Sequence, residues 1–484
     1  MTREAVQKYD VALARARCCA RAAVLLSACA SFLWRQLASR AAPKSTMSVS
    51  TQLAVVPPTA ASLLDLSHSW HGRLQLSAFD RRHACDVPRH EVSIKRSLSR
   101  WPHRLGGAEL TAGIEAAASW NATVLVAIRN NKLFADTSRL VAGSQYWEEL
   151  QEELLELLEL VEVRDVLFVL SLNDGAVVDA ADYDDGTPSA ATTPAVLSFT
   201  GSETHADILV PGPHLMKWAR PRPVHVVEPG SEFGAWREEV WAVDGVLAWA
   251  ERVPRLFWRG TNSFARQRAS GARECVGASF WEKCTARAIL VAASLEQPDE
   301  IDAGFATFEP WDHCLCGTPY AEVKRRSAKP FEPMAAQGNH RYLATIDGYT
   351  AAWRLARLVS LGSLVFKQAS HYMEFWYQWL KPWGHYVPLS EDVADVREKL
   401  AWARAHDDEA RRIAHAGQRL VRRALSIDQL RCYWARLLDE LGARQANAAA
   451  PAGGLELPPA FAGIYEKPVR PDEDVCGQVG TSDC

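Results

Sequence analysis

Residues that could do chemistry gather at three points of this 484-residue chain, each at the end of an apolar run typical of a buried strand. The three sequences are Asn173-Asp174-Gly175 after the run 165–172, Arg259-Gly260-Thr261-Asn262-Ser263 after 255–258, and Asp347-Gly348 after 342–346. Taken alone, Asn173-Asp174-Gly175 is more often a turn, and an arginine after a strand more often forms a surface salt bridge. The combination of the three makes a site more plausible, but the spacing alone still favours turns and salt bridges.

The chemistry that these segments offer is proton abstraction beside a bound diphosphate. The Asp174 carboxylate can act as a general base. Arg259 follows one strand, and Arg354 lies in the first turn of a helical segment, 350–361. Both arginines can bind a diphosphate through paired hydrogen bonds, together with N–H groups at the start of the helix. Ligands of open α/β sheets bind at the carboxyl ends of the strands, so we expect the site there.

Two other groups of residues have weaker support. Asp182 and Asp184 form a D-x-D pattern, but they lie in a loop rich in Ala, Asp and Thr, which favours a solvated acidic loop over a metal site. His205 and Asp207 form either a polar pair near the site or a structural histidine with an acidic neighbour. The sequence lacks G-x-G-x-x-G, P-loop, G-x-S-x-G and H-E-x-x-H motifs, which argues against dinucleotide-binding, NTP-hydrolysing, α/β-hydrolase and zincin functions.

Composition and length limit the class of protein. Apolar residues make up 48% and charged residues 23%, which excludes a wholly disordered, collagen-like or multi-span membrane chain. The net charge of −4 gives no global basic field, so we expect no nucleic-acid partner. The length predicts two large domains plus tails. In an oxidising compartment, disulfides are allowed among five of the eleven cysteines: Cys275, Cys284, Cys314, Cys316 and Cys432.

Strand-like and helix-like segments alternate from Val92 onward, which predicts an α/β protein with parallel sheets. The segment 124–134 predicts a hairpin that turns at Asn130-Asn131, and 144–163 has the apolar spacing of a helix. Later segments predict helix 234–251, strand 255–258, strand 342–346, helix 350–361, strand 363–368 and two closing helices at 391–426 and 428–445.

The two ends of the chain have compositions of their own. Residues 1–46 are rich in Lys and Arg and contain 13 uncharged residues between Arg21 and Arg35, which is typical of a secretory signal or a short signal anchor. An organelle transit peptide and a plain soluble helix are the alternatives. Residues 47–91 are expected to form a linker or stem, and residues 446–484 an extended tail.

The stretch RLFWRGTNS (255–263), the segment 341–389 that begins RYLATIDGYTAAWRLARL, and the closing segment 406–438 resemble glycosyltransferase family 90. The resemblance covers roughly Val92 to Leu441. It implies a GT-B architecture, in which two Rossmann-like domains, 92–233 for the acceptor and base and 234–445 for the UDP-sugar, face a cleft. It also implies inverting transfer of a sugar, glucose or xylose, from a UDP-sugar to a hydroxyl on a protein or glycan, without a metal or cofactor.

The resemblance assigns roles to single residues. Asp174 takes the place of the catalytic base, although this chain has N-D-G-A where the family has D-x-P or D-W-P. Arg259 and Arg354 match the arginines of the family's F-R-G-S and A-A-x-R motifs, and Glu374 matches a glutamate expected to contact ribose or sugar. The other residues expected at the donor are Gly260, Thr261, Ser263, Arg268, Asp347, Gly348, Ala351 and Ala352, and those expected at the acceptor or sugar pocket are His205 and Asp207.

The resemblance also implies an address in the secretory pathway, in the lumen of the endoplasmic reticulum or Golgi, with the N-terminal segment either removed or serving as a single-pass type II membrane anchor. The departure from the family's pattern at Asp174 keeps a second function open, a catalytically inactive lectin-like or chaperone protein of that pathway. A third, an unrelated α/β enzyme such as a reductase, would need a dinucleotide fingerprint that the sequence lacks.

Overall fold

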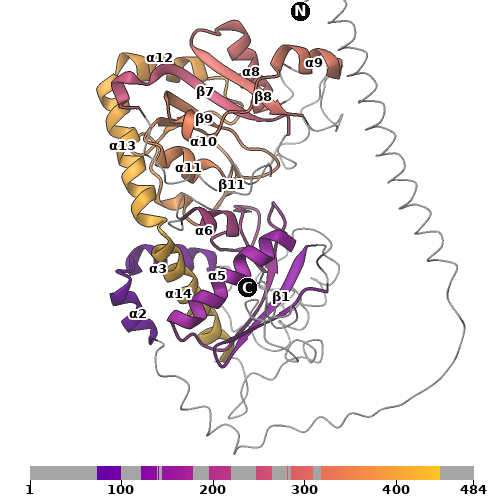
Figure 1. Ribbon diagram of the computed structural model, residues 1–484, viewed down its shortest axis with the longest axis vertical. Coiled ribbons are helices and arrows are strands. Elements are labelled where there is room, and N and C mark those ends of the chain that lie inside the picture. The colour runs from indigo at the N-terminus through magenta and orange to yellow at the C-terminus, as the bar shows by residue number, and fades with distance from the viewer. Residues whose placement is uncertain are drawn as a thin grey trace, which may run out of the picture. The chain divides into compact units, whose positions relative to one another are not determined.

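Two five-stranded sheets organise the part of the chain that the computed structural model describes (Figure 1). The described residues are 74–99, 122–138, 140, 144–177, 196–219, 247–263, 281, 285–308 and 318–446. The expected leader and C-terminal tail lie outside these residues, as do Asp182, Asp184, Arg268 and most of the expected helix 234–251. Within these ranges, no helix is both long and apolar enough to cross a membrane.

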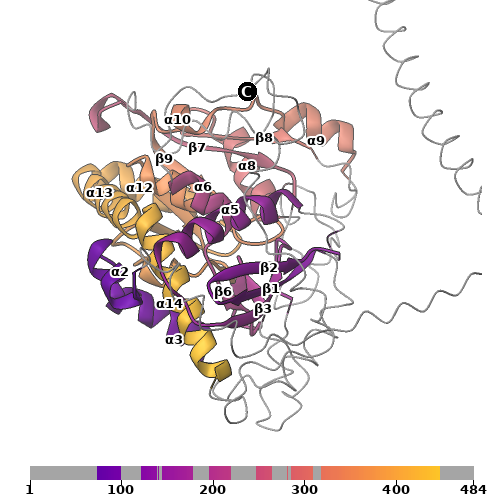
Figure 2. The same ribbon diagram turned by 60° about the horizontal axis from the view of Figure 1, so that its bottom comes forward.

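The first sheet is mixed, with strand order β2-β1-β3-β4-β6 (Figure 2). Its strands are β1 (Thr123–Arg129), β2 (Lys132–Asp136), β3 (Val166–Ser171), β4 (Val196–Ser198) and β6 (Ile208–Leu209). The predicted hairpin is confirmed: β1 and β2 pair across Asn130 and Asn131, whose φ angles of 49° and 58° are those that a tight two-residue turn needs. β3 is parallel to β4, as expected of a buried apolar run, but antiparallel to β1.

The second sheet is parallel throughout, with strand order β12-β10-β9-β7-β8. Its strands are β7 (Val253–Thr261), β8 (Ile301–Thr307), β9 (His340–Thr345), β10 (Leu364–Gln368) and β12 (Val387–Leu389). From β7 the chain steps outward to β8, then returns to the other side of β7 as β9 and continues outward. The order therefore reverses between β7 and β9, and in open α/β sheets the carboxyl ends of two such strands border the ligand crevice.

The helices that accompany the sheets differ from the expected ones at three places. Their bounds are α2 (Leu76–Arg82), α3 (Val87–Ser97), α5 (Ser144–Leu160), α6 (Pro213–Ala219), α8 (Ala286–Glu296), α9 (Tyr320–Ser327), α10 (Met334–Gln337), α11 (Leu355–Ser360), α12 (Val396–Ala405), α13 (Asp407–Ala424) and α14 (Ile427–Ala446). The helix expected over 350–361 begins only at Leu355, so Arg354 directly precedes its first turn. The helix expected over 391–426 is two helices, because His406 has non-helical backbone angles and the acidic residues after it begin a new helix. The described part of the expected linker, 74–91, is also largely helical.

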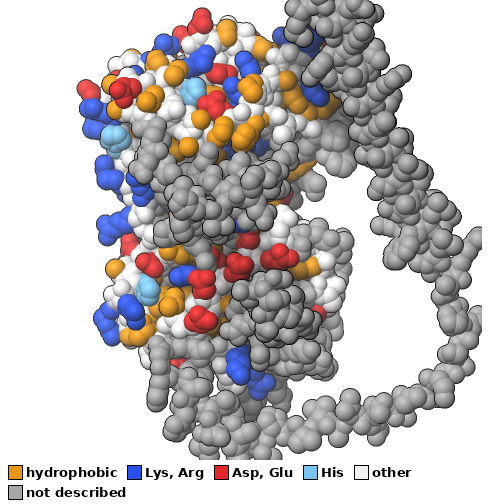
Figure 3. Space-filling view, in the orientation of Figure 1, with side chains coloured by type: hydrophobic (Ala, Val, Ile, Leu, Met, Phe, Trp, Pro, Cys, Tyr) orange, Lys and Arg blue, Asp and Glu red, His pale blue; other side chains and the backbone are white. Residues whose placement is uncertain are grey.

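The helix α13 has a buried face of small and aliphatic side chains and an exposed face rich in arginine. Its buried side chains are small or aliphatic, among them Ala410, Ile413 and Val421. Its exposed side chains include five arginines: Arg411, Arg412, Arg419, Arg422 and Arg423. Figure 3 shows the corresponding row of Lys and Arg side chains along one edge of the view, where α13 lies in Figure 1.

The last helix, α14, returns to pack against elements of the first sheet, although the sequence assigns it to the domain expected over 234–445. It contacts α2, α3, α6 and β3 (Figure 1). A disulfide joins Cys432 on α14 to Cys85, between α2 and α3, a pairing that the sequence did not indicate. Residues 74–97 are consequently part of the folded body rather than a stem.

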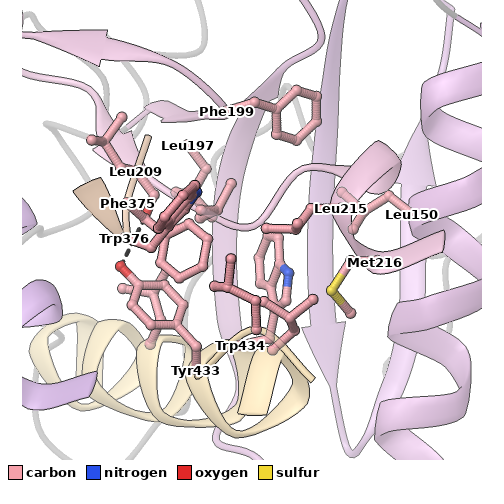
Figure 4. Close-up of a cluster of buried hydrophobic side chains, with 14 of the residues drawn as sticks. Leu150, Leu197, Phe199, Leu209, Leu215, Met216, Phe375, Trp376, Tyr433 and Trp434 are labelled. Atoms are coloured by element: carbon pink, nitrogen blue, oxygen red, sulfur yellow. Dashed lines mark hydrogen bonds between the residues drawn. The ribbon is translucent and has the colours of Figure 1, made fainter. Parts of the chain in front are cut away.

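The apolar core beneath α14 explains why this helix returns. Trp434 and Tyr433 are fully buried, and they lie among Leu197, Leu209, Leu215 and Phe375 (Figure 4). The Tyr433 hydroxyl donates a hydrogen bond to the Leu209 carbonyl oxygen at 2.9 Å. Fully burying an aromatic or aliphatic side chain stabilises a fold by about 1.5–3 kcal/mol. The burial of Trp376, Tyr433 and Trp434 therefore favours this arrangement strongly.

Candidate functional site

The loop between β9 and α11 is shaped by the carboxylate of Asp347. Its Oδ1 accepts a hydrogen bond from the Ala352 N–H at 3.0 Å, and its Oδ2 accepts one from the Ser370 hydroxyl. Burial raises the pKa of Asp347, and the nearby Lys367 ammonium opposes that shift. Ala351 and Ala352 are buried in the same loop. The expected donor residues Asp347, Ala351 and Ala352 thus form the frame of one loop at the carboxyl end of β9.

Arg287, in the first turn of α8, ties this loop to the end of β7. Its guanidinium donates to the Asp347 carbonyl at 2.9 Å, to the Thr261 carbonyl at 3.0 Å and to the Ser263 hydroxyl at 2.6 Å. A Cβ atom at Gly348 would lie 2.7 Å from Arg287 Nη2, so only glycine leaves room for this arginine. Sequence reasoning missed Arg287. The available signal was an arginine facing inward from the otherwise apolar helix ARAILVAASLE.

Arg354 and Arg259, the two arginines expected at a diphosphate, have different surroundings. Arg259 is 6% exposed, and its guanidinium pairs with the Asp302 carboxylate at 3.1 Å and donates to the Pro330 and Asp302 carbonyls. The Arg354 guanidinium donates to the carbonyl oxygen of Arg259, at the end of β7. Arg354 therefore reaches the carboxyl end of β7, whereas the Arg259 side chain binds to neighbouring protein groups and contributes only its carbonyl to Arg354.

Ionisable side chains also gather at the end of β10. Burial lowers the pKa of Lys367, and the carboxylates of Asp347 and Glu374 partly offset that shift. The Lys367 ammonium lies 4.9 Å from the centre of the Tyr377 ring, and burial together with the two carboxylates raises the pKa of Tyr377 well above its ordinary value. Glu374 is 3% exposed. The expected sugar contact thus shares a buried, charged environment with Lys367, which the sequence did not single out.

Asp174 lies in the turn after β3 and is exposed. Two contacts fix this turn. Asp207, which is buried, accepts hydrogen bonds from the Val177 N–H at 3.0 Å and from the Ser198 hydroxyl at 2.5 Å. A Cβ atom at Gly175 would lie 3.1 Å from the Thr350 methyl group, so the turn packs against the β9–α11 loop.

This packing brings the Asp174 turn to the loop that carries Arg354. Burial raises the pKa of Tyr146, and the negative charge of Asp174 adds to this shift. The Tyr146 ring lies edge-on to Trp353, with 5.8 Å between the ring centres. Asp207 thus holds the loop that bears Asp174, and its expected contact with the acceptor or sugar stays a prediction.

The remaining expected residues lie nearby or outside the described part of the chain. The His205 ring bonds to the hydroxyls of Ser202 and Thr204, next to β5 (Gly201–Ser202), which pairs with β11 (Tyr372–Met373). Gly260 is buried on β7. Among the described residues, no group of three His, Cys, Asp or Glu side chains is arranged to hold a metal ion.

The match to known proteins extends over most of the chain. The profile of glycosyl transferase family 90 matches residues 82–457, which is more than half of the sequence. Protein O-glucosyltransferase 3 of Mus musculus is 32% identical over 44% of this chain and 37% of its own length.

Two further relatives match longer segments. Protein O-glucosyltransferase 2 of Danio rerio is 28% identical over 68% of this chain and 57% of its own, and protein O-glucosyltransferase 1 of Homo sapiens is 28% identical over 51% and 56%. The chain therefore spans less than two thirds of the length of these relatives. Because the family profile covers the sheets, the β9–α11 loop and the returning helix together, the chain belongs to glycosyl transferase family 90.

Proposed function

We propose that the chain is an inverting glycosyltransferase of the GT-B type that moves a sugar from a UDP-sugar to a hydroxyl group on a protein or glycan. The observation that carries the proposal is the place of Arg354. It lies on the loop after β9, and its guanidinium reaches the end of β7, where the strand order of the parallel sheet reverses. That crevice is where a nucleotide is expected to bind in such a sheet.

The donor side would work by charge stabilisation. As the sugar carbon separates from UDP, it gains oxocarbenium character, and the leaving diphosphate gains negative charge. Arg354 is the guanidinium proposed to stabilise that charge, held at the end of β7 by the Arg259 carbonyl. Arg287 fixes the ends of both strands, so that the Arg354 loop needs little rearrangement when the donor binds.

The acceptor side needs a base, because the pKa of a hydroxyl group is far above 7. Asp174 is proposed for this role: it is exposed, and its turn packs against Thr350, four residues before Arg354. Its carboxylate would take the acceptor proton while the oxygen attacks the sugar carbon from the face opposite to UDP. Glu374 is proposed to contact the ribose or the sugar.

The relatives and the disulfide support a proposal for the donor, the acceptor and the compartment. The names of the relatives, protein O-glucosyltransferases, favour glucose as the sugar and a protein as the acceptor, with xylose as the other donor to test. The Cys85–Cys432 disulfide supports an oxidising compartment such as the lumen of the endoplasmic reticulum or Golgi. The basic, partly apolar leader favours delivery to that compartment, as a signal that is either cleaved off or retained as a membrane anchor.

A UDP-release assay tests the proposal. The full-length chain is supplied with UDP-glucose or UDP-xylose and a folded protein acceptor, alongside Asp174→Asn and Asp136→Asn. Asp174→Asn keeps the shape of the side chain and removes the proton acceptor, so turnover should fall by ~10²–10⁴-fold while UDP binding stays unchanged. Asp136, a half-buried aspartate at the end of β2, serves as the control for the same substitution outside the proposed site.

Two results would count against the proposal. UDP binding without turnover in the wild type would favour the inactive lectin-like or chaperone alternative. Turnover that survives in Asp174→Asn would remove Asp174 from the role of base.

A further inference from the structure

His214, near the start of α6, is a buried histidine that touches two residues next to the proposed donor site. Its ring stacks on the Trp353 indole, with the ring centres 4.3 Å apart and an angle of 2° between the planes. Its Nε2 lies 3.8 Å from Oε2 of Glu374. His214 is 7% exposed. One side chain on the first sheet's side of the molecule thus contacts both Trp353 and Glu374.

Trp353 is held by the first sheet although it belongs to the loop after β9. Its indole N–H donates to the Thr200 hydroxyl at 3.0 Å. Tyr146 and Phe199 meet the indole edge-on, at 5.8 and 6.5 Å between ring centres. Trp353 directly precedes Arg354 in the chain, so an indole that cannot turn also fixes the backbone from which the Arg354 side chain starts.

Glu374 has one carboxylate oxygen engaged by protein groups and one left for another partner. Its Oε2 accepts a hydrogen bond from the Trp376 indole N–H at 3.3 Å and faces His214. Its Oε1 is buried and has no hydrogen-bond partner of good geometry among the described residues, although the Tyr377 side chain also interacts with this carboxylate. A buried acceptor without a partner is unfavourable, so this oxygen is suited to receive a hydroxyl group of a bound ligand.

We infer that His214 is a positioning residue of the donor site. The face of its ring holds Trp353 and, through it, Arg354, while its Nε2 edge turns Glu374 so that Oε1 points to the hydroxyl groups of the UDP-sugar. This inference rests on the proposed function. In this inference, the first sheet's side of the molecule contributes to donor binding through His214 on α6, in addition to supplying the proposed base.

Donor affinity is the quantity that separates this role from a structural one. A buried histidine that only supports the fold would, when replaced, lower the folded fraction and hence the apparent kcat, with no change in KM. A positioning residue raises the Kd for UDP and the KM for UDP-glucose. His214→Ala removes both contacts, whereas His214→Phe keeps a flat ring against Trp353 and removes only the contact with Glu374.

The control is His90→Phe. His90 is also buried, 1% exposed, and packs against the rings of Trp379 and Tyr433, without a ring contact to Trp353 or an ion pair with Glu374 among the described residues. For His214→Ala we expect Kd and KM to rise by about tenfold, the size seen when a residue that orients a binding group is removed, with kcat nearly constant. His214→Phe should recover part of that loss. His90→Phe should change neither quantity.

The measurements are calorimetric titration with UDP and steady-state kinetics with UDP-glucose, with thermal unfolding of every variant. Should His214→Ala fail to fold, Thr200→Val removes the hydrogen bond to Trp353 without changing the shape of the side chain, and it should raise Kd as well. Kd and KM values for folded His214 variants that equal those of His90→Phe would overturn the inference alone. A wild-type chain that binds no UDP would refute the proposed function and the inference with it.

Discussion

Arg354 illustrates how a binding side chain depends on its immediate neighbours. Desolvation lowers its pKa to about 10, which still leaves the guanidinium charged at neutral pH. Its hydrogen bond to the Arg259 carbonyl fixes one end of the fork and leaves further N–H groups to donate to an anion. The charge and the geometry are thus in place before any ligand binds.

Replacing Arg354 should weaken UDP binding selectively. Arg354→Ala is expected to reduce the affinity by roughly 1.5–3 kcal/mol, the range for hydrogen bonds to charged groups. Arg354→Lys should recover only part of this loss, because a point charge cannot replace a planar fork. Calorimetric titration with UDP measures the effect, and Arg411→Ala, on the exposed face of α13, is the control. Equal affinities for Arg354→Ala and the control would remove Arg354 from the donor site.

At the scale of elements, the turn after β3 owes its position to another strand. Asp207, which directly precedes β6, accepts a hydrogen bond from the Val177 N–H, which ties the end of the 173–177 loop to the sheet, and a second from the Ser198 hydroxyl on β4, which holds the Asp207 carboxylate in place. The exposed Asp174 can therefore be held in one place without packing of its own side chain. The contact between Gly175 and Thr350 fixes the other side of the turn.

Loss of the Asp207 carboxylate should affect turnover more than donor binding. Asp207→Ala leaves the Val177 N–H and the Ser198 hydroxyl without this acceptor, which should reduce stability by about 1–3 kcal/mol and lower kcat through movement of Asp174. The Kd for UDP should stay within twofold of wild type. Denaturant unfolding and UDP-release kinetics measure both effects. Asp136→Ala, which removes a similar hydrogen bond to the Ser138 N–H, is the comparison. The idea fails if the two variants have the same kcat.

Local patterns in the sequence predicted the individual strands and turns better than they predicted which elements contact one another. The Asn130-Asn131 hairpin and the strands around 166–171, 253–261, 340–345 and 364–368 follow from short-range apolar runs and turn residues, and the structure contains them. Arg259 was less predictable, because a motif position does not say on which face of β7 a side chain lies. Its partner, Asp302, comes from the next strand.

Long-range pairings account for what the sequence did not reveal. Cys85 and Cys432 are 347 residues apart, and the spacing of eleven cysteines cannot identify such a pair. Arg287, His214 and Trp353 each connect elements that are distant in the chain, so their roles appear only once the sheets are placed. The packing of α14 against the first sheet has the same origin, because its contacts with α2, α3, α6 and β3 join segments far apart in the chain.

On the scale of the whole molecule, the disulfide is expected to contribute strongly to stability. Cys85→Ser with Cys432→Ser removes a link that closes a very long loop of the unfolded chain, so the free energy of unfolding should fall by about 2–4 kcal/mol. Wild type treated with dithiothreitol should approach the double variant in thermal unfolding. The double variant itself should respond little to the reductant, which separates this bond from the other cysteines. An unchanged melting temperature in the double variant would contradict the prediction.

The activity as a whole should withstand chelation. Arginine side chains are proposed to neutralise the leaving diphosphate, so EDTA should leave UDP release largely intact. The assay compares untreated, EDTA-treated and manganese-supplemented enzyme. Complete loss on chelation with recovery in manganese would instead direct attention to Asp182 and Asp184.

The return of α14 also has a consequence for the order in which the protein can fold during synthesis. The strands of the second sheet and their helices lie in one continuous stretch, 253–424, and can assemble as soon as that stretch leaves the ribosome. The first sheet is translated earlier, yet it lacks the helix that covers it until residues 427–446 appear. Its apolar surface is therefore exposed to chaperones throughout translation of the second sheet, and the half of the protein that is made first is completed last.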